Sequence, residues 1–244
     1  MKNKLIVNTL LAFACISSTS CFAAQSAEQM IQDMQTHATK PEYIPKSRSV
    51  VMFGKQTKEA VVVLENPRWV VKGQLYDMWS NTEIVGISEL HEASKKIPLN
   101  RINIDLNRAL TIRTNTTKPM TLTVFIDPFK ETAMKDIETL LKYANGYQLN
   151  FVLFTKDRGE NSVKRLFSLA CDIQGKSINK QLAILMNQST QIKDVACSKE
   201  QVIASYGSAS ILGIVRSPTL ISSTFVASEG FPKNLTKWLL ENMK

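Results

Sequence analysis

The clearest pattern in this chain is a series of apolar segments that follows residue 119. Thr121–Ile126 and Tyr147–Phe154 are mostly apolar or β-branched, which is typical of strands buried in a sheet. Between them, Thr132–Ala144 carries apolar positions at helical spacing. This rhythm of strand, helix and strand predicts that residues 119–244 form an α/β domain.

Further elements complete this predicted domain. Three helical segments after the second strand predict a helical insertion, and two short strands precede a last helix that starts at Pro232. The helices are expected near Ser162–Ala170, Ser177–Met186 and Lys199–Ile211, and the strands at Pro218–Ser222 and Thr224–Ala227.

The first part of the chain has shorter apolar runs. They predict a small α+β domain over residues 24–85, which begins with a short amphipathic helix over Ser26–His37. The strand-like runs are Val50–Phe53, Ala60–Leu64 and Arg68–Trp79, the last bent at Gly73.

A linker is predicted between the two domains, over residues 86–118. A helix is expected to start at Ser88 and to end before Pro98. Arg101–Leu106 alternates strictly, as a strand would. The polar, turn-rich segment Thr114–Pro119 is the expected boundary with the second domain.

The N-terminus carries a targeting pattern. Two lysines precede the apolar run Leu5–Ile16, and an A-x-A-like site ends at Ala23. This predicts a signal peptide over residues 1–23 and a periplasmic mature protein. A membrane anchor is the alternative, but the run is about a dozen residues, too short to span a bilayer. A lipidated Cys21 is another, although the expected Leu is absent three positions before it. No later segment predicts a membrane span.

Charge narrows the classes of partner. The formal net charge is +9, and it falls to +7 when Lys2 and Lys4 leave with the signal peptide. The basic residues are scattered and do not interleave with aromatic residues, so no nucleic-acid platform is predicted. The glycines do not cluster into a phosphate loop, and neither His37 nor His91 stands in a catalytic motif.

The candidate site lies where the first buried strand runs through Asp127-Pro128 into a helix. A late x-Pro-Thr, here Ser217, Pro218 and Thr219, precedes another strand. This pairing is typical of a thioredoxin-type domain, whose turn carries C-x-x-C at a helix N-terminus. Here the four positions are Lys130, Glu131, Thr132 and Ala133. With Lys and Ala where the sulfurs would be, this site cannot exchange a disulfide, and no catalytic residue is assigned.

Two cysteines remain after signal cleavage, Cys171 and Cys197. In an exported protein, such a pair is most simply a structural disulfide. The alternative is a redox couple distant from the degenerate site. Metal binding has little support because the two histidines are far from the cysteines in sequence. No metal or cofactor is predicted.

The mature chain resembles the DsbC-type periplasmic disulfide isomerases. The resemblance rests on Arg68–Asp77, Val124–Pro128, Ser217–Thr219 and Glu229-Gly230, in that order along the chain. It implies a V-shaped protein with a cystatin-like N-terminal dimerisation domain, a linker helix and a thioredoxin-like domain with a structural disulfide. The missing cysteines mean that isomerase activity does not carry over.

The main hypothesis is therefore a non-enzymatic periplasmic protein that binds other proteins. Its role would be that of a chaperone or of a component of a conjugative transfer or secretion system. The Ser217–Thr219 loop is expected to hold an extended peptide through backbone hydrogen bonds. A homodimer is expected through residues 49–80, unless the helix at Ser26–His37 covers the strand edge. The alternative is an oxidoreductase that uses Cys171 and Cys197.

Overall fold

The computed structural model describes residues 37–66, 68–157, 159–187, 191–193 and 197–244. The chain divides into two compact units, residues 1–94 and 95–244. The predicted signal peptide, and the predicted helix at Ser26–His37 except for His37, lie outside the described residues. Within the described ranges, no helix combines the length and the apolar character needed to cross a membrane.

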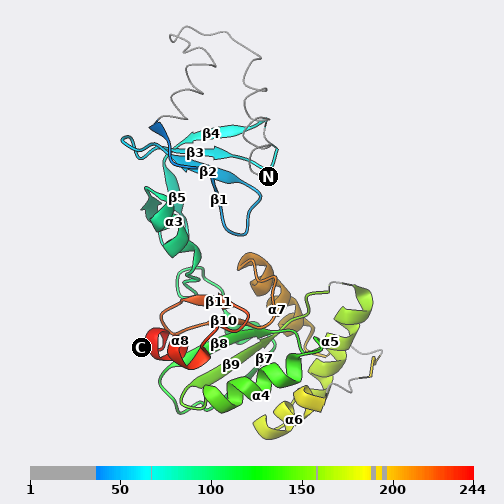
Figure 1. The fold of residues 1–244 in the computed structure, drawn as a ribbon. Helices are drawn as coiled ribbons and strands as arrows, with labels where there is room; N and C mark the ends of the chain where they lie inside the picture. Colours follow the sequence, from blue (N-terminus) through cyan, green and yellow to red (C-terminus); the bar gives the residue numbers. More distant parts are fainter. Residues whose placement is uncertain (1–36, 67, 158, 188–190, 194–196) are drawn as a thin grey trace. The chain divides into compact units, whose positions relative to one another are not determined.

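The first unit contains a small antiparallel sheet (Figure 1). Its strands follow chain order: β1 (Glu42–Tyr43), β2 (Val50–Phe53), β3 (Ala60–Val63) and β4 (Val70–Gly73). A separate ribbon of β5 (Leu75–Asp77) and β6 (Thr82–Ile84) leads into helix α3 (Ile87–Ser94). Gly73 thus ends one strand, and the predicted bent strand is divided between two sheets. The core of the unit consists of Val51, Phe53, Ala60, Ile84 and Leu90.

Strand β4 forms one edge of this sheet. Its neighbour β3 pairs with it from Ala60↔Gly73 to Val63↔Val70. Val70 and Val71 are 51% and 54% exposed, and Trp69 just before them is 55% exposed. Within the part of the chain that the structure describes, no strand pairs with the other side of β4, and an apolar strand with such an open edge is a template for pairing with another strand.

The second unit is built on a five-stranded sheet with the order β11-β10-β8-β9-β7. Central strands β8 and β9 are parallel, and the other neighbours are antiparallel. The strands are β7 (Thr111–Thr114), β8 (Thr121–Ile126), β9 (Gln148–Leu153), β10 (Thr219–Ile221) and β11 (Ala227–Glu229).

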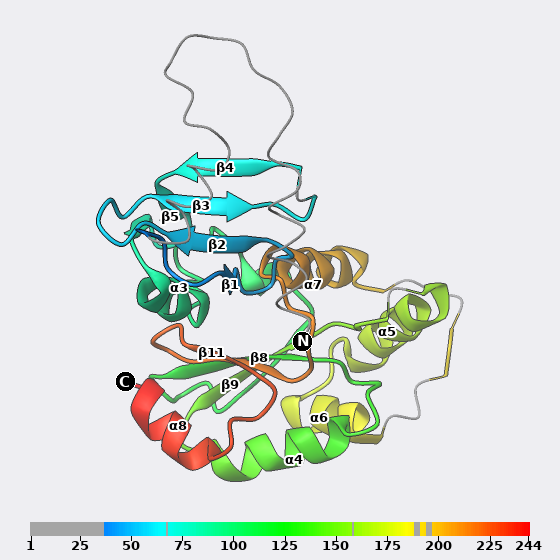
Figure 2. The ribbon, with the colours of Figure 1, turned by 45° about the horizontal axis from the view of Figure 1, so that its top comes forward.

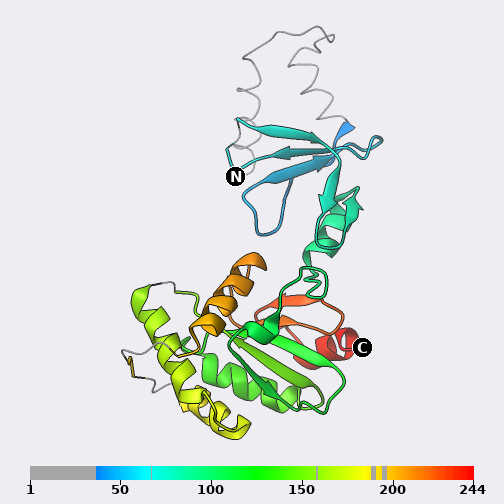
Figure 3. The same ribbon diagram turned by 180° about the vertical axis from the view of Figure 1, so that it is seen from behind.

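Helices cover both faces of this sheet. Figures 1 and 2 show α4 and α8 along one face and α7 on the opposite face, and Figure 3 shows the same sheet from behind. The insertion between β9 and β10 supplies three of the helices, as the sequence predicts. The helices are α4 (Ala133–Tyr143), α5 (Glu160–Ile173), α6 (Ile178–Asn187), α7 (Lys199–Ile211) and α8 (Leu235–Asn242).

The core of the second unit follows from strand alternation. Leu122, Val124 and Ile126 of β8 join the main cluster together with Ile137 of α4 and Leu239 of α8. Burial of such side chains stabilises the fold by roughly 1.5–3 kcal/mol each. The unit therefore has the thioredoxin-like α/β fold with a helical insertion that the sequence predicts.

The structure corrects the predicted linker of residues 86–118. Residues 95–118 belong to the second unit, because β7 pairs with β9 from Thr111↔Val152 to Thr114↔Leu149. The predicted strand at Arg101–Leu106 does not form. That segment consists of turns in which Asn103 has a φ of 54°, and Leu106 begins a short 3-10 helix, η1 (Leu106–Arg108).

Candidate functional site

Neighbouring strands bring the two predicted site segments together. Strand β8 ends at Ile126, and α4 begins at Ala133, so Lys130–Thr132 form the turn between them. The Ser217–Pro218 peptide bond is cis and directly precedes β10. Because Thr219 of β10 pairs with Phe125 of β8, the end of one strand meets the start of the other.

Lys130 connects these two segments. Its Nζ donates a hydrogen bond to the carbonyl oxygen of Ser217 at 2.7 Å and lies 3.4 Å from Oδ2 of Asp136. The Lys130 side chain is 41% exposed, whereas that of Asp136 is 11% exposed. The hydroxyl of Thr132 also donates to Oδ2 of Asp136, at 2.9 Å. The lysine therefore links the turn before α4 to the cis-proline loop.

Asp127 is a second link at the same place. Its backbone N–H donates to Oγ of Ser217 at 2.8 Å. Its carboxylate accepts the backbone N–H of Phe129 at 3.0 Å and that of Lys156 at 2.9 Å. The sequence indicates a turn-forming role for Asp127, and the bond to Phe129 fits it. The bonds to Ser217 and Lys156 join segments far apart in sequence, which no local pattern indicates.

The other two residues of the degenerate motif differ in environment. Ala133 is fully buried, and Glu131 is exposed. Neither offers a sulfur nucleophile. What the site offers chemically is an ammonium donor, backbone carbonyl acceptors and two carboxylates that are already hydrogen-bonded. This set suits recognition through hydrogen bonds and charge.

Apolar and cationic groups flank the site in sequence. Met134, in the first turn of α4, is 47% exposed, and Val215, two residues before Ser217, is 55% exposed. The guanidinium of Arg165 lies 4.3 Å from the centre of the Phe129 ring, within cation–π range. The segments on either side of the site thus carry exposed apolar side chains, and one cation stacks on Phe129.

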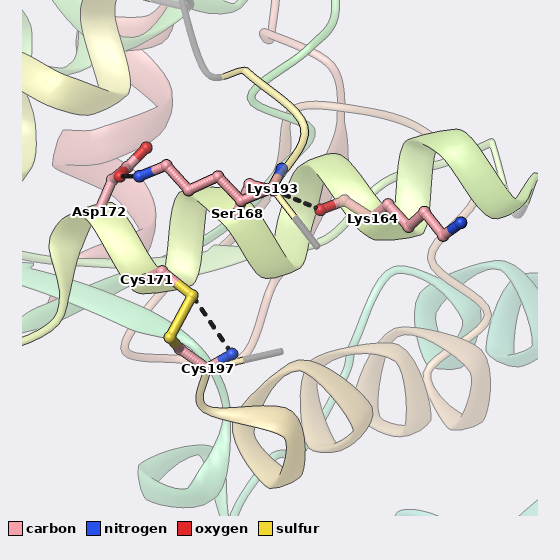
Figure 4. The surroundings of a disulfide bond; sticks show 6 residues. All are labelled: Lys164, Ser168, Cys171, Asp172, Lys193 and Cys197. Carbon is pink, nitrogen blue, oxygen red and sulfur yellow. Dashed lines mark hydrogen bonds and ion pairs between the residues drawn. A yellow bond between two sulfur atoms is a disulfide. The ribbon is translucent and has the colours of Figure 1, made fainter. Parts of the chain in front are cut away.

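The remaining cysteines form a disulfide on other elements (Figure 4). Cys171, late in α5, is bonded to Cys197, and their Cα atoms are 4.9 Å apart. The backbone N–H of Cys197 points to Sγ of Cys171 at 3.3 Å. Lys193 adds a second tie to α5 through an ion pair with Asp172 and a 2.8 Å bond from its N–H to Oγ of Ser168. The predicted disulfide is therefore present, and it links Cys197, just before α7, to α5.

The loop after β9 contains a perturbed carboxyl group. The hydroxyl of Ser162 donates to Asp157 at 2.6 Å, and the N–H of Gly159 donates at 2.8 Å. These two bonds hold the pKa of Asp157 below its ordinary value. Asp157 therefore stays ionised and orders the start of α5. Among the described residues, no three His, Cys, Asp or Glu side chains are grouped as a metal site would require.

Comparison of the sequence with known protein families and with curated proteins gives no match. Solved structures do show similarity. Helicobacter pylori DsbG is 16% identical with a TM-score of 0.38, over 79% of this chain and 97% of that one. A disulfide interchange protein from Neisseria gonorrhoeae is 14% identical with a TM-score of 0.42, over 57% and 99%. The catalytic domain of Proteus mirabilis ScsC is 13% identical with a TM-score of 0.39, over 54% and 86%.

These similarities concern the fold alone, because the identities and TM-scores are low. The fold assignment itself rests on this chain's own strand order and on the position of the cis-proline loop beside the end of β8.

Proposed function

We propose that this chain is an exported thioredoxin-fold protein that binds extended segments of other proteins and does not catalyse thiol–disulfide exchange. The observation that carries the proposal is the tie between Lys130 and Ser217 at the position where a redox protein of this fold holds its cysteines. Exchange requires a thiolate that attacks a disulfide. Lys130 and Ala133 supply no sulfur, so the site keeps its position in the fold and loses its thiol chemistry.

The binding role is supported by the backbone at the cis-proline loop. Ser217 lies outside the β10 ladder, which begins at Thr219, so among the described residues its carbonyl accepts from Lys130 and from no paired strand. An extended peptide gains affinity by adding backbone hydrogen bonds of this kind, and its side chains then need apolar contacts. The exposed side chains of Met134 and Val215 would provide such contacts.

The compartment and the partners are part of the same proposal. The predicted signal peptide at residues 1–23 would deliver the chain to the periplasm, where its partners would be proteins and not nucleic acid. The resemblance to DsbC-type proteins favours a chaperone or an assembly component of a transfer or secretion system. The exposed apolar edge of β4 favours a homodimer through the first unit.

The test measures binding under conditions in which thiol–disulfide exchange cannot contribute. Mature protein is added to an unfolded reporter protein that lacks cysteines, and aggregation is followed by light scattering. We expect suppression of aggregation by wild type and weaker suppression by Val215→Asp, because a charge would replace the apolar contact. Leu240→Asp, which changes an exposed residue on α8 that is 68% accessible, is the matched control and should act like wild type. Equal suppression by both variants would contradict a binding role for this loop.

One observation favours the alternative oxidoreductase. Cys197 directly precedes Ser198, the N-cap of α7, and a helix N-terminus stabilises a thiolate. Cys171 lies in the last turn of α5, where the helix dipole has the opposite sign. If this pair were catalytic, Cys197→Ala would abolish insulin reduction. Any such reduction by wild type would favour this alternative over the proposed function.

A further inference from the structure

We propose that Lys130 makes the cis-proline loop, Ser217–Thr219, selective for extended peptides that carry an acidic residue. The inference deepens the proposed function and rests on it. Lys130 Nζ donates a hydrogen bond to the Ser217 carbonyl oxygen, the acceptor that a bound peptide would use. A ligand that gives the ammonium a better acceptor releases this carbonyl for its own backbone N–H.

The geometry shows why a neutral peptide is at a disadvantage. The bond from Lys130 Nζ to the Ser217 oxygen is 2.7 Å long, which is short for a nitrogen donor. A neutral strand that pairs with Ser217 must compete with this charged donor, and it offers the displaced ammonium no charged acceptor in exchange. A hydrogen bond with a charged donor is stronger than one between neutral backbone groups, so the competition disfavours the neutral strand.

An acidic side chain reverses this balance. A carboxylate accepts from an ammonium more strongly than a neutral carbonyl does. Lys130 lies on a flexible stem at the surface, with a side chain that is 41% exposed, so it can turn from Ser217 to an incoming carboxylate. The Ser217 carbonyl then becomes available, and one acidic residue secures both a charge pair and a backbone bond.

Other charges near the site have to be compatible with this exchange. Asp136 lies behind Lys130, and the Thr132 hydroxyl at 2.9 Å is closer to its Oδ2 than the ammonium is at 3.4 Å. Part of the negative charge of Asp136 is therefore compensated without Lys130. Arg216, next to Ser217, pairs with Glu229 at 3.6 Å and is 70% exposed. The formal net charge of +9, which falls to +7 without Lys2 and Lys4, also attracts acidic segments at a distance, within the limits of salt screening.

The test compares matched peptides. Fluorescent nonapeptides of alternating Val and Thr carry a single Glu or Gln at one of the central positions, and binding to the mature protein is measured by fluorescence anisotropy. For at least one position we expect the Glu peptide to bind about fivefold more tightly than its Gln partner at low salt, the size of an exposed charge pair. High salt should reduce the difference.

Variants assign the selectivity to Lys130. Lys130→Met should remove the preference for Glu and tighten binding of the Gln peptide, because the carbonyl is no longer occupied. Lys135→Met is the matched control: Lys135 is exposed in the first turn of α4, so the variant changes the charge equally and should keep the preference. Lys130→Gln provides a second, polar replacement if the Met variant folds poorly, as judged by circular dichroism.

The outcomes separate this inference from the function on which it rests. Equal binding of Glu and Gln peptides by wild type, or a preference that survives in Lys130→Met and Lys130→Gln, would overturn the selectivity while leaving peptide binding intact. Failure of every peptide to bind wild type and both Lys130 variants would overturn the binding function itself, and the selectivity with it.

Discussion

The ammonium of Lys130 donates a hydrogen bond to the carbonyl oxygen of Ser217 at 2.7 Å, although the two residues are 87 positions apart in the chain. The bond joins the turn before α4 to the loop before β10. Asp127 reinforces the junction through its N–H bond to Oγ of the same serine. The predicted site is therefore a polar junction between two parts of the fold.

This junction should contribute to stability. Lys130→Met removes the bond to Ser217 and leaves Asp136, 8% exposed, without its ion-pair partner. We expect the free energy of unfolding to fall by about 1 kcal/mol, because Lys130 is partly solvated and its charge pair is screened. Urea unfolding at constant m-value measures the change. The control Lys135→Met should stay within about 0.5 kcal/mol of wild type, and an equal loss in both variants would contradict the proposed junction.

The absence of sulfur at this site predicts the absence of thiol chemistry. The mature wild-type protein should not accelerate reduction of insulin by dithiothreitol or the reshuffling of scrambled ribonuclease. The double variant Lys130→Cys/Ala133→Cys should gain measurable activity, because its first thiol would lie close to the N-terminus of α4, where a thiolate is stabilised. Activity of wild type at the rate of a true isomerase would contradict the prediction.

Strands with continuous apolar character were predictable from the sequence alone. Thr121–Ile126 is the observed β8 without any change in bounds, because its burial on both faces leaves a strong local signal. Strand β7 (Thr111–Thr114) was not predicted, because only Ile112 among its four residues is a large apolar side chain. It is a strand because β9 pairs with it. Arg101–Leu106 was predicted as a strand from its alternation but forms none, because none of the described strands pairs with it.

The site was predictable as a location but not as a set of contacts. The sequence indicated that Lys130 and Ser217 lie in the two segments that meet in a thioredoxin-like domain. No pattern in the sequence pairs the charge of Lys130 with that of Asp136. The 3.4 Å approach of these two side chains depends on the shape of the turn before α4, and the bond to Ser217 depends on the pairing of β8 with β10. Neither leaves a periodic signal.

The Cys171–Cys197 bond should be present in the exported protein and should be structural. Mass spectrometry of a non-reduced digest should recover the two cysteines as one linked peptide pair. Replacing both by Ala should lower the free energy of unfolding by about 2–4 kcal/mol, as expected for a loop of this length, 26 residues apart in sequence. Peptide binding should be unchanged, because the site lies on other elements. Two free thiols in the wild-type protein would contradict this assignment.

The last prediction is that the protein forms a homodimer through β4, at the edge of the first sheet. The backbone of β4 alternates between groups that bond to β3 and groups that point outward. Because the N–H of Leu64 bonds to the carbonyl of Trp69, alternation places the backbone groups of Val70 on the open side. Two copies related by a two-fold axis can pair these open edges and cover the exposed apolar side chains.

Val70→Pro tests this arrangement, because proline removes an outward N–H and leaves the bonds to β3 in place. Light scattering of the mature wild type at micromolar concentration should give the mass of two chains, and Val70→Pro should give the mass of one. Val70→Thr keeps both the N–H and the β-branched shape and should remain dimeric. A chain that starts at Lys95 should be monomeric and folded, since the second unit has its own core. A wild-type mass of one chain would reject the dimer and favour coverage of the edge by residues 26–37.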